Sequence, residues 1–554
     1  MASGPHLHLR RRSSAAQLYA VSQVEREIRA ADPHSRRKYI REFAEAFRSY
    51  RGPVSRLELS QELERADVLL VADYHALPAS QHYAAELLEQ LSPRGRPLAL
   101  ALEAVYSRDQ RILDAWQERL LEDGELRERI HFDQQWGFSW EPFLALLKAA
   151  RSAGARIYGL DTVPRDNLRR IAARDEHAAG RIAEIASLAP EIRIAVLFGE
   201  SHMAPQHLPA EIKRRLPGAR VLTLLQNVDS LYWAARGETA AQVEAVRVSD
   251  DVVCVFSATP LEKYESYRQC LTRWQQGNPS GLDLTPSFYN VISALSRFLG
   301  IDSPPAERLP LLADLLPEVI IRPAGHFLPL LRRRINDQRR MRELLSRIER
   351  EGCAYAVETN TIYAQRFELA SAAAAAARFV HAACSGLLEA QSRPSGPEFA
   401  SPEDRFYALC LSETVADFGA RILHPGRGVV EEGELYARYS RCRAELAVSY
   451  RDYLRMLDLV TLHRDFECNA HHYRRIPQLI SEGRSYTGSK LHFVTSLLGQ
   501  FLGTRSYQLY LKGGVDRRYL RSLYFRPLEK PGEPKLAFFQ LARRTRRRWR
   551  RLAA

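Results

Sequence analysis

Two short segments of the chain carry histidines at a spacing that suits acid–base chemistry. Segment 72–75 reads ADYH and segment 199–202 reads GESH, so each has a small residue, then an acid, then a histidine two positions later. A small residue lets the chain turn sharply where a strand ends, and the histidine can then point back over the sheet edge. His75 and His202 are therefore predicted to act as general bases near neutral pH or as metal ligands.

Hydrophobic segments typical of buried parallel strands precede these motifs. They alternate with helical patterns, and one or two further strands are expected within 243–258. The alternation predicts an α/β fold with a mostly parallel sheet and helices on both faces. Ligands of such sheets bind beyond the carboxyl ends of the strands. The predicted strands are 66–72, 97–104, 155–161, 193–199 and 219–226.

Four of these strands bring acids or imidazoles to that edge of the sheet. Glu103 and Asp161 end the second and third strands, while His75 follows the first and the pair Glu200 and His202 follows the fourth. We expect catalytic roles for His75, Glu103, Glu200 and His202, with Glu200 behind His202, because a carboxylate orients an imidazole or shifts its pKa. If a divalent metal binds instead, the expected ligands are His75, Glu103, Asp161 and His202. No third histidine stands at a spacing typical of zinc sites.

This half of the chain resembles the ChaN-type haem-binding domain, which is similar to the Tiki proteases and the erythromycin esterases. The resemblance covers about residues 60–260 and rests on the strings LVADYHALPASQH, LALEA, QQWGFSWEPFLALLKAARSAGARIYGLD, ARDEHAAGRI and LFGESHM. The family's shared mark is a pair of G-x-x-H motifs with a Glu on the intervening strand. Segment 199–202 matches the second motif and Glu103 matches the strand Glu. The first motif departs, with Ala72 in place of Gly and Asp73 where Glu is common.

The resemblance implies two different activities, and fold alone does not choose between them. ChaN-like members are associated with haem binding in iron uptake. Tiki-like and esterase members hydrolyse a peptide or ester bond, some with a divalent metal. The implied cofactor is thus haem or a divalent metal, and the implied substrate is a small molecule or a peptide. Haem needs an axial ligand such as His, Tyr or Met, for which Tyr74, His82 and Met203 are candidates.

The rest of the chain predicts a different architecture. Residues 1–60 are expected to form a disordered start and a helical lead-in, and residues 61–262 the α/β domain. Helical periodicity dominates from about residue 280, so 280–535 is predicted to be a mostly helical domain of unknown role, followed by a basic tail at 536–554. In the helical half, Glu413 and Asp417 lie one helical turn apart. We assign neither of them a basic partner and expect both on a solvated surface.

Composition narrows the classes of function. The chain has 554 residues, 45 % of them hydrophobic, and a net charge of +14, as expected for a folded protein of several domains. Arginines cluster at 10–12 and 543–551. Such tails attract nucleic acid, anionic lipid or acidic partners, although a solvated tail explains them equally well. No zinc finger, helix-turn-helix or RNA-recognition signature supports nucleic acid. An anionic surface is therefore a possible partner of the C-terminal tail, and the oligomeric state stays open.

The expected location is the cytoplasm. Seven scattered cysteines form no CxxC pair, which favours reduced thiols, and neither an export signal nor a long apolar run is found. Three hypotheses remain open on the sequence alone. The protein is a hydrolase-like or metal-binding enzyme, a haem-binding module, or a non-catalytic scaffold whose helical half and arginine tail bind a partner or a membrane.

Overall fold

The computed structural model describes residues 5–32, 38–92, 96–162, 171–189, 191–235, 243–276, 282–301, 312–323, 325–391, 399–428, 460 and 488–553. The chain divides into two units, one formed by Val24–Gly281 and the other by Met1–Gln23 together with Leu282–Ala554. Helix α1 (Pro5–Ala31) has residues in both. No helix among the described residues is long and apolar enough to cross a membrane.

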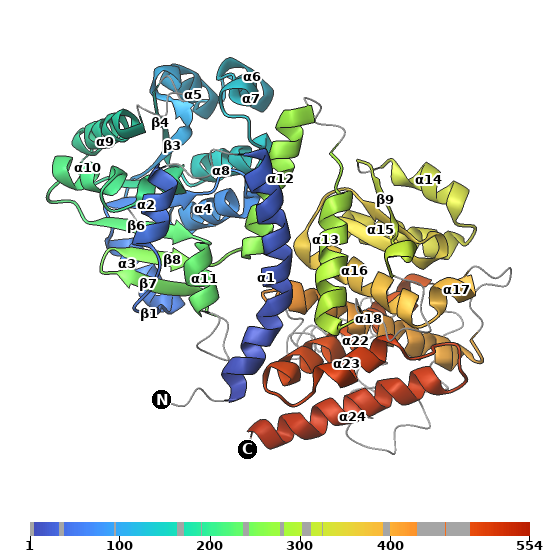
Figure 1. Ribbon diagram of the computed structural model, residues 1–554. Helices are drawn as coiled ribbons and strands as arrows, with labels where there is room; N and C mark the ends of the chain where they lie inside the picture. Colours follow the sequence, from blue (N-terminus) through green and yellow to red (C-terminus); the bar gives the residue numbers. More distant parts are fainter. Residues whose placement is uncertain are drawn as a thin grey trace, which may run out of the picture. The chain divides into compact units, whose positions relative to one another are not determined.

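The unit Val24–Gly281 is built on one eight-stranded sheet (Figure 1). Its strands are β1 (Gly52–Pro53), β2 (Val68–Asp73), β3 (Leu98–Tyr106), β4 (Arg156–Asp161), β5 (Arg193–Gly199), β6 (Val221–Gln226), β7 (Ala245–Ser249) and β8 (Val252–Val255). The order is β1-β7-β8-β6-β2-β5-β3-β4. Strand β7 pairs antiparallel with both of its neighbours, β1 and β8, and the other pairs are parallel. The predicted α/β fold with a mostly parallel sheet is confirmed. The apolar runs of its central strands are buried on both faces, as in parallel sheets generally.

Helices cover both faces of this sheet. Successive strand residues point to opposite faces, so Leu69 and Val71 join one core cluster while Val68 and Leu70 join the other. The first cluster includes residues of α4 (Pro78–Leu91), α5 (Gln110–Gln117), α6 (Asp123–Arg129), α7 (Phe132–Gln135) and α8 (Trp140–Ser152). The second includes residues of α2 (Lys38–Ala46), α9 (Ile171–Leu188), α10 (Leu208–Arg215) and α11 (Asp229–Ala235). Helices α3 (Arg56–Arg65) and α12 (Pro260–Gln276) complete the unit.

The second unit is mainly helical, as predicted, with a small sheet (Figure 1). The sheet has the order β10-β11-β9, in which β10 (Cys353–Ala356) and β11 (Thr361–Ala364) pair antiparallel and β9 (Glu318–Ile321) lies parallel to β11. The helices are α13 (Thr285–Leu299), α14 (Phe327–Arg334), α15 (Gln338–Glu351), α16 (Leu369–Cys384), α17 (Leu387–Gln391), α18 (Pro402–Leu423), α22 (Gly488–Leu511), α23 (Arg517–Tyr524) and α24 (Glu533–Ala553).

The prediction of a solvated acidic pair in this unit is wrong. Glu413 and Asp417 are buried in α18. Arg347 of α15 lies 2.9 Å from Glu413, and Arg378 of α16 lies 2.8 Å from it. Arg421 donates to Asp417 at 2.8 Å. The sequence did not reveal the partners of Glu413 because they come from two other helices, 35 and 66 positions away.

Part of the predicted basic tail lies in helix α24. Within it, the guanidinium of Arg544 stacks over the ring of Tyr519 at 4.0 Å from the centroid. Such a contact holds at least one arginine of the cluster against the protein. Binding of an anionic surface by this segment stays a prediction.

Candidate functional site

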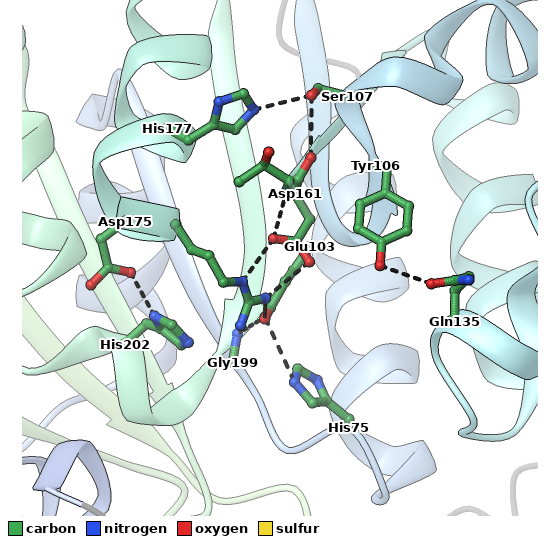
Figure 2. A network of polar contacts seen from close by, with 12 residues as sticks. His75, Glu103, Tyr106, Ser107, Gln135, Asp161, Asp175, His177, Gly199 and His202 are labelled. Carbon is green, nitrogen blue, oxygen red and sulfur yellow. Dashed lines mark hydrogen bonds and ion pairs between the residues drawn. The ribbon is translucent and has the colours of Figure 1, made fainter. Parts of the chain in front are cut away.

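The carboxyl ends of neighbouring parallel strands gather most of the predicted residues (Figure 2). Strand β5 lies between β2 and β3, and Asp73 at the end of β2 stands in register with Gly199 at the end of β5. Glu103 of β3 and Asp161 of β4 belong to the next two strands of the same sheet. Strand order therefore brings together side chains that are far apart in sequence.

Gly199 makes the centre of the site possible. A Cβ atom at this position would lie 3.1 Å from Glu103 Oε2 and 3.1 Å from His75 Nε2. The backbone N–H of Gly199 also donates to Glu103 Oε2 at 2.6 Å. A residue without a side chain thus lets the carboxylate and the imidazole approach the same stretch of backbone, which gives a physical reason for the glycine of the GESH segment.

His75 is held by Asp73 in the arrangement of a general base. The distance between His75 Nδ1 and Asp73 Oδ2 is 2.8 Å, and Gln81 donates to the other oxygen of Asp73 at 2.5 Å. A buried carboxylate at Nδ1 favours the tautomer with the proton on that nitrogen, which leaves Nε2 as the basic atom. Nε2 lies 3.6 Å from Glu103 Oε2, and the His75 side chain is 21 % exposed. The shorter acid of the first motif therefore reaches its histidine.

Electrostatics favour a charged carboxylate beside this imidazole. Burial lowers the pKa of His75, but the hydrogen bond and charge of Asp73 and the charge of Glu103 outweigh it and raise the pKa above its ordinary value. Burial raises the pKa of Glu103, but the positive charge of Arg174 and of His75 outweighs it and lowers that pKa to about 2. Glu103 is thus ionised at neutral pH, while His75 gains basicity.

Arg174 of α9, which sequence reasoning missed, ties two of the predicted acids together. Its Nη2 donates to Glu103 Oε1 at 2.5 Å, and its Nε and Nη2 donate to the two oxygens of Asp161 at 2.9 Å each. Planar, two-point contact of this kind is typical of arginine with carboxylates. The sequence offered one signal for Arg174, which is the density of charged residues in the segment ARDEHAAGRI.

A second histidine–aspartate pair lies deeper in the same network. His202 Nδ1 is 2.5 Å from Asp175 Oδ1, and Tyr39 donates to Asp175 Oδ2 at 3.1 Å. We expected Glu200 behind His202, and this is wrong because Asp175 stands there instead. His202 is only 6 % exposed. Figure 2 shows His75 and His202 on different sides of Glu103, whose pKa the charges of both imidazoles lower.

Glu200 pairs with a lysine that the sequence did not single out. Lys263 of α12 donates to Glu200 Oε2 at 2.9 Å and to the carbonyl oxygen of Asn227 at 3.3 Å. Burial raises the pKa of Glu200, and the charge of Lys263 opposes this without cancelling it. Glu200 therefore lies at the same sheet edge but is joined to α12 rather than to either histidine.

Comparison with known proteins covers the part of the chain that carries most of this site. Residues 59–195 match the family model described as haem-binding uptake, Tiki superfamily, ChaN. The α/β unit contains a ChaN/Tiki-superfamily domain. The matched residues include the Asp73–His75 pair, Glu103, Asp161 and Arg174. The segments around His202 and α12 lie beyond it.

Two solved structures are similar to parts of the chain. ChaN of Campylobacter jejuni, described with cofacial haem binding, is 15 % identical with a TM-score of 0.25, and the match covers 32 % of this chain and 87 % of that one. The type III effector HopBA1 is 15 % identical with a TM-score of 0.28, covering 38 % and 96 %. No curated protein matches the chain.

The donor set of this ChaN/Tiki-superfamily domain does not suit a divalent metal. Arg174 occupies the carboxylate oxygens of Glu103 and Asp161, which a cation would otherwise bind. Over the described ranges, no group of three or more His, Cys, Asp or Glu side chains could hold a metal ion. The ligand role predicted for His75, Glu103, Asp161 and His202 stays a prediction.

The candidate haem ligands of the domain differ in their surroundings. Met203 is 1 % exposed and packs in the second core cluster, so its sulfur does not suit a ligand at the surface. His82 lies exposed on α4. Tyr74 is partly exposed, with Lys263 Nζ 4.7 Å from its ring centroid and the Tyr267 ring at 6.1 Å. Tyr74 and His82 remain the residues that would hold a haem.

Proposed function

We propose that the ChaN/Tiki-superfamily domain hydrolyses an ester or peptide bond with His75 as the general base. The observation that carries this proposal is the Asp73–His75 hydrogen bond of 2.8 Å, which leaves Nε2 of a partly exposed imidazole beside Glu103. Proton transfer by a positioned histidine of this kind contributes about 10²–10⁴-fold to a hydrolytic rate.

Each residue then has a defined task. His75 Nε2 takes a proton from a water molecule, whose oxygen bonds to the carbonyl carbon. When the bond to the leaving alcohol or amine breaks, a proton returns from the imidazolium to the departing oxygen or nitrogen. Asp73 keeps the proton on Nδ1, and Gln81 fixes Asp73. The negative charge of Glu103 stabilises the imidazolium between the two transfers.

Arg174 is the proposed stabiliser of the developing oxyanion. Its Nε and Nη2 hold Asp161 and Glu103, while Nη1 makes no hydrogen bond to any described residue. A guanidinium fixed in this way donates without reorganising when negative charge develops. His202, fixed by Asp175, is the second proposed acid–base group of the site.

The experiment compares two histidine variants on a panel of activated esters and short peptides. His75→Asn should lower kcat/KM by about 10³–10⁴-fold. His131→Asn is the matched control, because His131 is exposed in the same unit and has a positive φ of 50°, which asparagine tolerates. The rate should not change with 1,10-phenanthroline. No hydrolysis across the panel, or equal rates for the two variants, would refute the proposal.

Haem binding is the second candidate, favoured by the description of the matching family and by the position of Tyr74. Haem would supply an iron centre, and Tyr74 or His82 would bind it. Titration with haemin should give a saturable Soret band that Tyr74→Phe or His82→Ala weakens. A linear, unsaturated response would dispose of this candidate.

We also propose a cytoplasmic location. Its support is that the cysteines the structure describes are free and buried rather than paired, namely Cys254, Cys270, Cys353, Cys384 and Cys410. Fractionation of the native host, with reduced thiols counted by alkylation, tests it. Recovery in an extracytoplasmic fraction would contradict it.

A further inference from the structure

Helix α12 adds side chains to the site from outside the stretch that the family model matches. It follows β8 in the same unit, whereas the match ends at residue 195. Lys263 near its start pairs with Glu200. Near its end, Trp274 Nε1 donates to the carbonyl oxygen of Gly137 at 2.8 Å, and Arg273 donates to Ser139 Oγ at 3.0 Å. The start of α12 is thus fixed at the sheet edge, and its end is fixed to the segment between α7 and α8, whose Phe138 contacts His75.

A continuous series of ring contacts passes from the loop after β2 to α12 and back to the proposed base. Tyr74 contacts Tyr267 at 6.1 Å between ring centroids, and Tyr267 contacts Trp274 at 6.1 Å. Trp274 contacts Phe138 at 5.4 Å, and Phe138 contacts His75 at 5.2 Å. The series therefore begins and ends at adjacent residues of the loop after β2. We call Tyr74, Phe138, Tyr267 and Trp274 the aromatic band, together with Trp136, whose ring centroid lies 4.4 Å from that of His75.

The aromatic band is not fully covered by the protein. Trp274 is 46 % exposed, although its indole is held in place by the Gly137 carbonyl. Tyr74, Phe138 and Tyr267 are partly exposed, as is His75. Large aromatic side chains that stay partly exposed beside a polar site are typical of a surface that binds a ligand.

We propose that the aromatic band binds a flat, apolar ring of the substrate, with the scissile bond at His75, and that Trp274 determines this specificity. The inference rests on the proposed function, because it names the substrate class of the same site. Edge-to-face and offset contacts with tyrosine, phenylalanine and tryptophan favour an aromatic group over a saturated one of equal size. The substrate class is an ester or amide of an aromatic acid.

The test separates binding from catalysis. Isothermal titration calorimetry on the full chain measures binding of 2-naphthamide against its saturated counterpart, decahydronaphthalene-2-carboxamide. The wild type should prefer the aromatic amide. Trp274→Leu, which keeps apolar bulk without a flat ring, should weaken its binding about tenfold, while Trp274→Phe should keep most of it. Trp233→Ala is the control, because Trp233 is a partly exposed tryptophan of α11 outside the band.

Two outcomes distinguish this inference from the proposed function. If Trp274→Leu binds both amides as the wild type does, or the wild type binds them equally, the inference is overturned, even where esters are hydrolysed through His75. If binding of 2-naphthamide depends on Trp274 but no ester is hydrolysed, the aromatic preference stands and the hydrolase proposal fails. With both holding, kcat/KM for a naphthoyl ester relative to an acetyl ester should fall about tenfold in Trp274→Leu.

Discussion

Each unit of the protein contains a buried cluster of arginine and carboxylate side chains, and the two clusters differ in what stands beside them. In the α/β unit, Arg174 binds Glu103 and Asp161 at the ends of strands. In the helical unit, Arg347 and Arg378 bind Glu413 between helices. Ion pairing is thus common to both and marks neither as a site.

The feature that separates them is an oriented imidazole. Glu103 faces the basic nitrogen of a partly exposed histidine that a second carboxylate holds, whereas the described partners of Glu413 are arginines, which do not exchange protons near neutral pH. Buried ion pairs of the second kind serve folding specificity in some proteins. The comparison predicts that equivalent changes in the two clusters have different consequences.

The largest difference should come from neutralising one aspartate next to each cluster, namely Asp73 and Asp417. Asp73→Asn removes the carboxylate that keeps the proton on His75 Nδ1, so kcat/KM should fall about 10³-fold or more, as in triads with the wrong tautomer. Asp417→Asn in α18 removes the partner of Arg421 and should leave kcat/KM per folded molecule unchanged. Steady-state kinetics with active fractions normalised by circular dichroism make the comparison. A similar rate loss in both variants would show that the clusters are not functionally different.

The next effect is on stability and should appear in the helical unit. Glu413→Ala leaves the guanidinium groups of Arg347 and Arg378 buried and without this carboxylate. Breaking a buried pair from one side costs about 3–5 kcal/mol of unfolding free energy. Urea denaturation monitored by circular dichroism measures it. A loss below about 1 kcal/mol would mean that water reaches these arginines, and the cluster would then be a surface feature after all.

Much of this contrast was invisible in the sequence, for physical reasons. Strand periodicity and the two histidine segments predicted the sheet and the edge at which His75, Glu103 and Asp161 lie, because parallel strands align their carboxyl ends. The partners of those residues could not be predicted in the same way. Arg174 and Asp175 come from one helix, and which of its faces meets the sheet depends on tertiary packing.

Glu200 and Glu413 illustrate the same limit. The order of residues in GESH suggested that Glu200 supports His202, yet the two side chains follow a turn and separate, with Asp175 at His202 and Lys263 at Glu200. Glu413 looked unpaired because both of its arginines are distant in sequence. Local spacing therefore predicted which side chains gather at the sheet edge but not the charged groups that contact them.

Two glycines, one in each unit, offer a comparison with smaller expected effects. In Gly199→Ala the new Cβ would stand 3.1 Å from His75 Nε2 and from Glu103 Oε2, so these groups must shift by a few tenths of an ångström and kcat/KM should fall about tenfold. In Gly503→Ala of α22 it would stand 2.7 Å from the Thr414 carbonyl oxygen, which should cost about 1–3 kcal/mol of stability by overpacking. Steady-state kinetics and urea denaturation of both variants should show a loss of kcat/KM mainly in Gly199→Ala and a loss of stability mainly in Gly503→Ala. A loss of kcat/KM confined to Gly503→Ala would contradict the placement of the site in the α/β unit.

The smallest expected effect is a shift of a pH profile. His75 acts as a base only when neutral, and its pKa is raised above 6.5 although burial lowers it, because Asp73 and Glu103 favour the protonated ring. Activity should therefore be lost as pH falls through this raised pKa. Glu103→Gln removes one of the charges that raise it, so the acid limb of kcat/KM should move to lower pH, by up to about one unit. Glu413→Gln should leave the limb in place. An unmoved limb in Glu103→Gln would show that another group titrates, and His202, whose charge also acts on Glu103, would be the next residue to replace.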